Sequence, residues 1–109
     1  MDFAPSGKTY RLDYLGDGTS ASLQIAPCGA VQIFSTENVV VNFGTTEALS
    51  EADYPTSSGD SGNGCIVQGD WLTVVPVPGF QRIPAGGTFW ISASSDTAGY
   101  LLVSTGALI

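Results

Sequence analysis

The chain contains no histidine and only three cationic side chains among its 109 residues. Histidine is the usual base for a serine or cysteine nucleophile and a common zinc ligand, so its absence argues against both kinds of site. Three cations against ten carboxylates give a net charge of −7. Binding of nucleic acid needs cations that neutralise phosphates, and an anionic membrane surface attracts the same charges. We therefore expect no contact with nucleic acid or with a membrane surface.

Long apolar runs are also missing, since none approaches the ~20 residues that a transmembrane helix needs. Residues 1–7 contain neither a basic start nor an apolar stretch, unlike a secretory signal peptide. We therefore expect a protein made and kept in the cytoplasm, where cysteines are usually reduced. The two cysteines, Cys28 and Cys65, are expected to be free thiols, with a disulfide between them as the alternative.

Several short motifs are similar to catalytic or metal-binding sequences but lack an essential partner. Gly59-Asp60-Ser61-Gly62 matches the stretch around the nucleophile of chymotrypsin-like proteases, yet the chain has no histidine base. Residues 60–64 place oxygen ligands at alternate positions, but a calcium loop also needs further carboxylates and a late glutamate. Two of the ten carboxylates could pair as in a glycosidase, although the sequence singles out no pair. We expect no catalytic residue, no metal site and no cofactor.

Apolar and polar residues alternate along most of the chain, which is the pattern of half-buried β-strands. Glycine-containing turns at 16–18 and 96–99 predict two hairpins, one from the first two strands and one from the last two. The expected strands lie at residues 9–14, 20–25, 31 to a turn at 37–38, 39–43, 65–67, 71–75, 88–94 and 100–104, with a short extended piece at 80–83.

This pattern predicts an all-β fold, a single small β-sandwich or jelly-roll-like barrel of about seven to eight short antiparallel strands. One domain spans residues 1–109, with residues 1–8 as a candidate N-terminal arm. The main irregularity follows Gly44. Residues 45–53 fit a single turn of helix, and residues 55–64 are small and polar, so we expect them to form a mobile loop.

Large apolar residues remain as candidates for contacts with other proteins, because tryptophan and tyrosine are enriched in interfaces. Adjacent Phe89 and Trp90 point to opposite sides of a strand, so one of them is expected in the core. Both chain ends are apolar, and they either contact a neighbour or fold back onto the domain. The alternative use of exposed aromatic rings is stacking on sugars. The candidate interface residues are Phe3, Trp71, Phe89, Trp90, Leu108 and Ile109.

From Asn38 onward the order of features resembles small virion proteins of tailed bacteriophages. A valine-rich strand ends in Phe-Gly at 39–44, a variable polar stretch follows, and the next strand is bounded by proline and glycine at 76–79. An aromatic strand, a small-residue turn and a final strand that ends in Thr-Gly close the pattern over residues 88–106. The resemblance covers about two thirds of the chain and lies in strands and turns, not in a catalytic motif.

The resemblance implies a non-enzymatic structural protein of the virion, made in the host cytoplasm and assembled on the phage particle in many copies. Head decoration (cement) proteins, which bind and stabilise the shell, are the first expectation, and neck or tail components are the second. The implied partners are the phage major capsid protein and further copies of the chain, for example in a trimer. A small carbohydrate-binding or adhesive β-module is the alternative outside the virion.

Overall fold

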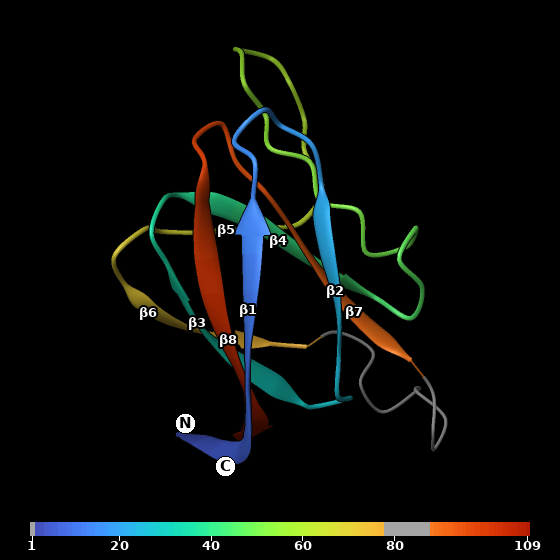
Figure 1. Ribbon diagram of the computed structural model, residues 1–109, viewed down its shortest axis with the longest axis vertical. Helices are drawn as coiled ribbons and strands as arrows, with labels where there is room; N and C mark the ends of the chain where they lie inside the picture. Colours follow the sequence, from blue (N-terminus) through green and yellow to red (C-terminus); the bar gives the residue numbers. More distant parts are fainter. Residues whose placement is uncertain (1, 78–87) are drawn as a thin grey trace.

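The computed structural model describes residues 2–77 and 88–109 of the chain (Figure 1). Within these residues the structure contains eight strands and no helix. The strands are β1 (Phe3–Tyr14), β2 (Ala21–Ile25), β3 (Ala30–Ser35), β4 (Val39–Gly44), β5 (Cys65–Val67), β6 (Leu72–Pro76), β7 (Phe89–Ser94) and β8 (Gly99–Leu108). The expected all-β fold is thus confirmed. The extended piece expected at 80–83 lies outside the described residues.

The strands form two four-stranded antiparallel sheets that are wound as a jelly roll. Sheet A has the order β1-β8-β3-β6, and sheet B has the order β2-β7-β4-β5. The chain resembles one long hairpin in which β1 pairs with β8, β2 with β7, β3 with β6 and β4 with β5. Successive pairs of this hairpin lie in alternate sheets, so the ribbon wraps around a single core (Figure 1).

Both hairpins expected between neighbouring strands are wrong. The turn after β1 leads from sheet A to sheet B, and the turn after β7 leads back from sheet B to sheet A. The two turns lie against each other, because the N–H of Gly18 donates to the carbonyl of Ser95 at 3.1 Å and the hydroxyl of Ser94 donates to the carbonyl of Gly18 at 2.8 Å. A turn that crosses between sheets uses the same glycine-rich residues as a hairpin turn, so sequence alone does not separate them.

The hydrophobic core lies between the inner faces of the two sheets. Phe89 is 1% exposed, and its ring stacks on Phe43 with centroids 5.9 Å apart. Phe89 is therefore a core residue, and its expected place in an interface is wrong. Trp90, on the opposite side of the same strand, is half-buried. The core also contains the fully buried side chains of Val31, Ile33, Val41, Ile91, Leu101 and Val103.

Residues 3–8 are part of sheet A, unlike the N-terminal arm that the sequence suggested. Phe3 to Pro5 pair with residues 106–108 of β8, and the register then shifts between Pro5 and Thr9. The backbones of Asp2 and Ile109 exchange hydrogen bonds of 3.1 and 2.9 Å, so the two ends of the chain lie side by side (Figure 1).

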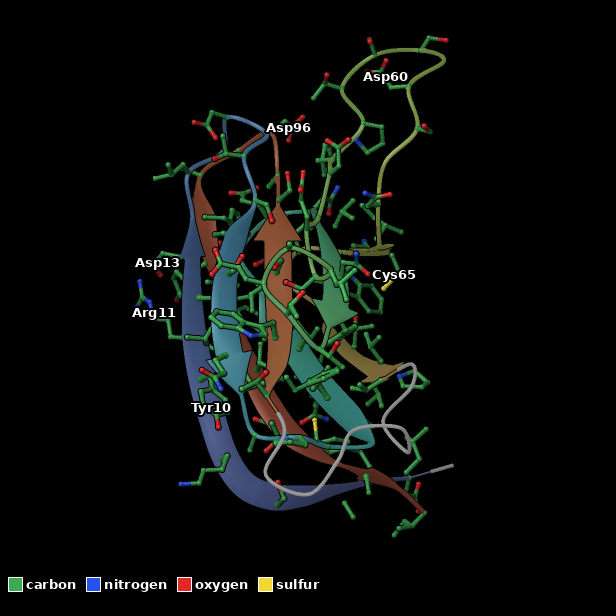
Figure 2. The ribbon with its side chains drawn as sticks, turned by 90° about the vertical axis from the view of Figure 1, so that its right-hand side faces the viewer. Tyr10, Arg11, Asp13, Asp60, Cys65 and Asp96 are labelled. Carbon is green, nitrogen blue, oxygen red and sulfur yellow. The ribbon has the colours of Figure 1, made fainter. Side chains whose placement is uncertain are left out.

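The connection from 45 to 64 runs over the outer face of sheet B before it projects beyond the sheets (Figure 2). It begins with one helical turn, in which the N–H of Ser50 donates to the carbonyl of Thr46 at 3.1 Å. The buried hydroxyl of Ser50 lies 2.7 Å from that of Ser92 on β7. This polar contact holds the first half of the connection on the sheet.

The second half of the connection forms the projecting tip that Asp60 marks in Figure 2. An isolated bridge between Asp53 and Asn63 closes its base. At the tip, the carboxylate of Asp60 accepts hydrogen bonds from the backbone N–H and the hydroxyl of Ser57 at 3.1 and 2.8 Å. These bonds lower the pKa of Asp60. The mobility expected for residues 55–64 stays a prediction.

Candidate interaction surface

Exposed apolar side chains are concentrated in one short segment of the chain. Of the eight large hydrophobic residues that are exposed in the described part, four lie within residues 66–74. They are Ile66 (64%), Trp71 (62%), Leu72 (64%) and Val74 (39%). The segment is nearly free of charge, since Asp70 is the only charged residue between Asp60 and Arg82. We call residues 65–76 the edge surface.

The strand order explains why these side chains have no cover. β5 is the last strand of sheet B and β6 is the last strand of sheet A, so the edge surface forms where both sheets end (Figure 1). Along β6 the side chains alternate, and Val75 packs against the core. Leu72 and Val74 therefore point away from the core, onto the outer face of sheet A. Because β6 also carries apolar side chains on the face that points away from the core, we interpret this outer face as a contact surface for another protein.

Two neighbouring strands extend this apolar area across the outer face of sheet A. Phe34 on β3 pairs with Leu72 on β6 and with Leu102 on β8. Directly paired residues place their side chains about 5 Å apart on one face. Leu72 and Leu102 are 64% and 37% exposed, and Phe34 is half-buried between them. The three side chains form one apolar row that ends at the free side of β6.

A groove of about 410 Å³ lies between the two sheet edges. It is mainly apolar because Phe43, Val75 and Pro76 line it, with Cys65 at its rim. The groove exists because β5 begins only at Cys65 and leaves residues 42–44 of β4 without a partner on that side.

Both cysteines are free thiols, as expected, and they differ in exposure. Cys28 is buried in the core. Cys65 is exposed, as its label in Figure 2 shows, and it lines the groove. Burial raises the pKa of the Cys28 thiol, and partial burial at the groove raises that of Cys65. A raised pKa lowers the thiolate fraction near neutral pH, and the thiolate is the reactive form. Neither cysteine has the environment of a nucleophile.

Thiol labelling should separate the two cysteines. At pH 8 we expect iodoacetamide to modify Cys65 more slowly than free cysteine, whose pKa is about 8.5, and to leave Cys28 intact until the protein unfolds. The rate at Cys65 should continue to rise with pH after that of free cysteine has levelled off. Mass spectrometry of timed samples measures both rates, with Cys65→Ser as the control. Native labelling of Cys28 at the rate of Cys65 would contradict the described burial.

The structure does not bring the candidate interface residues together. Phe3 and Leu108 pair at the end of sheet A that carries the termini; both are half-buried, and Ile109 beside them is 76% exposed. Trp71 precedes β6 in sheet A, whereas Trp90 lies in sheet B between Gln24 and Gly44. The two tryptophans therefore do not form a stacking platform for sugars. The sequence reasoning missed Ile66, Phe34, Leu72, Val74 and Leu102.

A second hollow, of about 250 Å³, is polar and lies where four inter-strand connections meet. Tyr54 provides its only aromatic side chain among the described residues that line it. Asp70 has a left-handed backbone (φ 62°), and its N–H donates to the carbonyl of Ser35 at 2.7 Å. The remaining lining residues are Thr36, Glu37, Asn38, Gly69, Asp96 and Thr97. No group of three or more His, Cys, Asp or Glu within residues 2–77 and 88–109 is placed to hold a metal ion.

The chain matches no protein-family model, no curated protein and no solved structure. In the part that the structure describes, no helix has the length and apolar character needed to cross a membrane. The fold and the edge surface are therefore the grounds on which a function is assigned.

Proposed function

We propose that the protein is a non-enzymatic structural protein of a bacteriophage virion that decorates the head by binding the major capsid protein. The observation that carries the proposal is the apolar group on the outer face of sheet A, where Phe34, Leu72 and Leu102 pair across three strands and exposed Val74 lies beside them. Single exposed apolar side chains are normal on any protein, but a contiguous group of them marks a contact surface. Such a surface suits a protein that assembles with other proteins.

The viral part of the proposal is supported by three further features. The order of strands and turns from Asn38 to Gly106 resembles small virion proteins of tailed phages. The jelly roll is an architecture of virus capsid domains, although lectins share it, and a fold alone does not define a function. The acidic balance of the chain suits the outside of a shell better than contact with packaged DNA.

Binding to phage heads tests the proposal directly. Heads of the phage that encodes the chain, assembled without it, are incubated with the purified protein and sedimented. We expect saturable binding and heads that resist heat better after binding. The absence of saturable binding to heads would overturn head decoration, and binding to isolated necks or tails instead would favour a neck or tail component.

Trp71 provides a sharper test of the contact. Truncation of a tryptophan at the centre of an interface typically costs 2 kcal/mol or more, so we expect Trp71→Ala to weaken head binding about 30-fold. Leu15→Ala is the matched control, because Leu15 is 74% exposed but lies in the turn after β1. Equal binding by wild type and Trp71→Ala in the sedimentation assay would remove Trp71 from the contact.

The polar hollow favours a second candidate function, binding of a carbohydrate. An aromatic ring beside carboxylate and amide groups can orient a sugar, and in this hollow Tyr54 lies near Asn38 and Asp96. A glycan array separates the two candidates. Binding that is lost in Tyr54→Ala, while Tyr54→Ala still folds, would favour the carbohydrate-binding module; head decoration predicts no signal on the array.

A further inference from the structure

We propose that a second copy of the chain docks on β6 by antiparallel strand addition and forms a two-fold dimer. In this dimer the two copies of sheet A join into one continuous sheet through β6. The inference rests on the proposed function and is compatible with it, because strand addition uses the backbone edge of β6 and leaves the apolar outer face of sheet A available to the capsid protein. Its test uses the purified protein without phage heads, so the two proposals can fail separately.

Among residues 2–77 and 88–109, nothing gives the free side of β6 the features that usually protect a sheet edge. Native edge strands carry charged side chains, bulges or prolines, or lie under a loop or helix, because bare edges pair with other chains. β1, the other edge of sheet A, has a register shift after Pro5, and it carries Lys8, Arg11 and Asp13. β6 has no charged residue, an unbroken register with β3, and its proline only at the last position. No described strand pairs with its outer side.

The hydrogen-bonding groups of β6 are arranged for pairing. Pro76 has no N–H, and Val77 donates to the carbonyl of Gly29 at 3.0 Å. Bonding directions alternate along an antiparallel ladder, so Val75 and Thr73 also direct their backbone groups toward β3. The N–H and C=O groups of Leu72 and Val74 consequently face the free side. A second copy of β6 can pair with these groups without any change in sheet A, except for the Leu72 carbonyl, which lies opposite Pro76 and receives no N–H.

A second copy of β6 fits this edge because an antiparallel strand is complementary to itself across a two-fold axis. With the axis at Val74, the two Val74 residues exchange N–H and C=O bonds, and each Leu72 N–H faces the carbonyl of Pro76 in the other copy. The outer face of the joint then carries Leu72, Val74 and Pro76 of both copies. These are the side chains that are exposed on the single chain.

Charge explains why a second copy, and not a basic peptide, is the partner that fits. The stretch from 71 to 76 contains no ionisable residue, so it offers no charge for a basic segment to pair with. The two copies place no like charges opposite each other in the joint, although each copy has a net charge of −7. The long-range repulsion between the copies is screened by salt, since the Debye length falls from about 10 Å at 0.1 M to about 3 Å at 1 M.

The joint is small, so the dimer should be reversible. A standard interface buries about 800 Å² on each partner, and weak transient ones bury less. The joint involves only the five residues of β6 in each copy, so it belongs with the small, transient contacts. We expect a dissociation constant in the micromolar range and a mass that depends on concentration.

Analytical ultracentrifugation of the wild-type chain tests the dimer over a range of protein concentrations. We expect a monomer–dimer equilibrium whose dissociation constant falls at least about threefold when NaCl is raised from 0.1 to 1 M, because salt screens the repulsion. A monomer at all concentrations up to about 1 mM, a trimer, or a dimer that salt weakens would each overturn the proposal.

Variants locate the joint. Val74→Lys places two like charges directly opposite each other across the two-fold axis and should weaken the dimer by up to about fivefold, because such pairs cost up to about 1 kcal/mol. Val74→Pro keeps the surface apolar but removes the N–H on the free side, so it should also weaken the dimer. Leu49→Lys is the matched control, because Leu49 is 67% exposed and lies on the loop over sheet B.

Circular dichroism of each variant checks that the monomer still folds. An unchanged dissociation constant in folded Val74→Lys, or an equal weakening in Leu49→Lys, would contradict docking on β6. If only Val74→Lys weakens the dimer and folded Val74→Pro does not, the contact is apolar packing without strand addition, and the proposed geometry is overturned.

Discussion

Phe89→Ala is expected to destabilise the protein by about 3–5 kcal/mol, the usual cost of truncating a buried phenylalanine. Phe89 is 1% exposed and stacks on Phe43, so its removal leaves a cavity between the two sheets. Domains of this size unfold with only 5–15 kcal/mol. Each kcal/mol shifts the melting temperature of such a domain by about 4–8 °C, so a fall of at least about 12 °C is expected in thermal unfolding followed by circular dichroism.

The neighbouring tryptophan is the control for this experiment. Trp90 is half-buried on the outer face of sheet B, where it pairs with Gln24 and Gly44. Since part of its surface already contacts water, Trp90→Ala should cost less than half as much as Phe89→Ala. Circular dichroism is preferred to fluorescence because the control removes one of the two tryptophans. An equal loss in both variants would contradict the assignment of Phe89 to the core and of Trp90 to the surface.

The positions of the strands could be predicted because alternation is a local property. Tyr10, Leu12 and Tyr14 show it within five residues, and β1 contains all three. The strands at both ends of the chain are longer than expected: β1 begins at Phe3 and β8 continues to Leu108. Proline and glycine interrupt the alternation at these ends. The strands nevertheless extend through them, because residues 3–5 pair with residues 106–108. That pairing joins distant parts of the chain, so no local pattern reveals it.

The candidate surface was only partly predictable, and the reason is also topological. Trp71 was identified from its residue type, and Leu72 and Val74 were not. Their exposure depends on the place of β6 at the end of sheet A, which follows from the strand order. The same strand in the middle of a sheet under a loop would be buried on both faces. Phe89 is the opposite case. Its residue type made it a candidate for an interface, but its side chain is buried in the core.

The second large loss of stability is expected at the two turns, after β1 and after β7, that carry the chain from one sheet to the other. Gly16 lies in the turn after β1 with φ +81°, in the left-handed region that favours glycine. A Cβ atom at this position would overlap the backbone of Thr97 and Ala98 in the turn after β7. Backbone atoms of a paired turn cannot rotate away as a flexible side chain can. Gly16→Ala should therefore combine backbone strain of about 1–2 kcal/mol with overpacking of about 1–3 kcal/mol.

Gly18→Ala separates these two contributions. Gly18 has nearly the same backbone conformation, φ +83°, but a Cβ atom there meets nothing within 4 Å. We expect Gly18→Ala to cost only the backbone strain, about 1–2 kcal/mol, and Gly16→Ala to cost more by the overpacking. Urea unfolding followed by circular dichroism measures both. Equal costs would mean that the two turns do not touch. A larger cost at Gly16 would show that the turns which carry the chain between the sheets are packed as one unit, which two independent hairpins would not require.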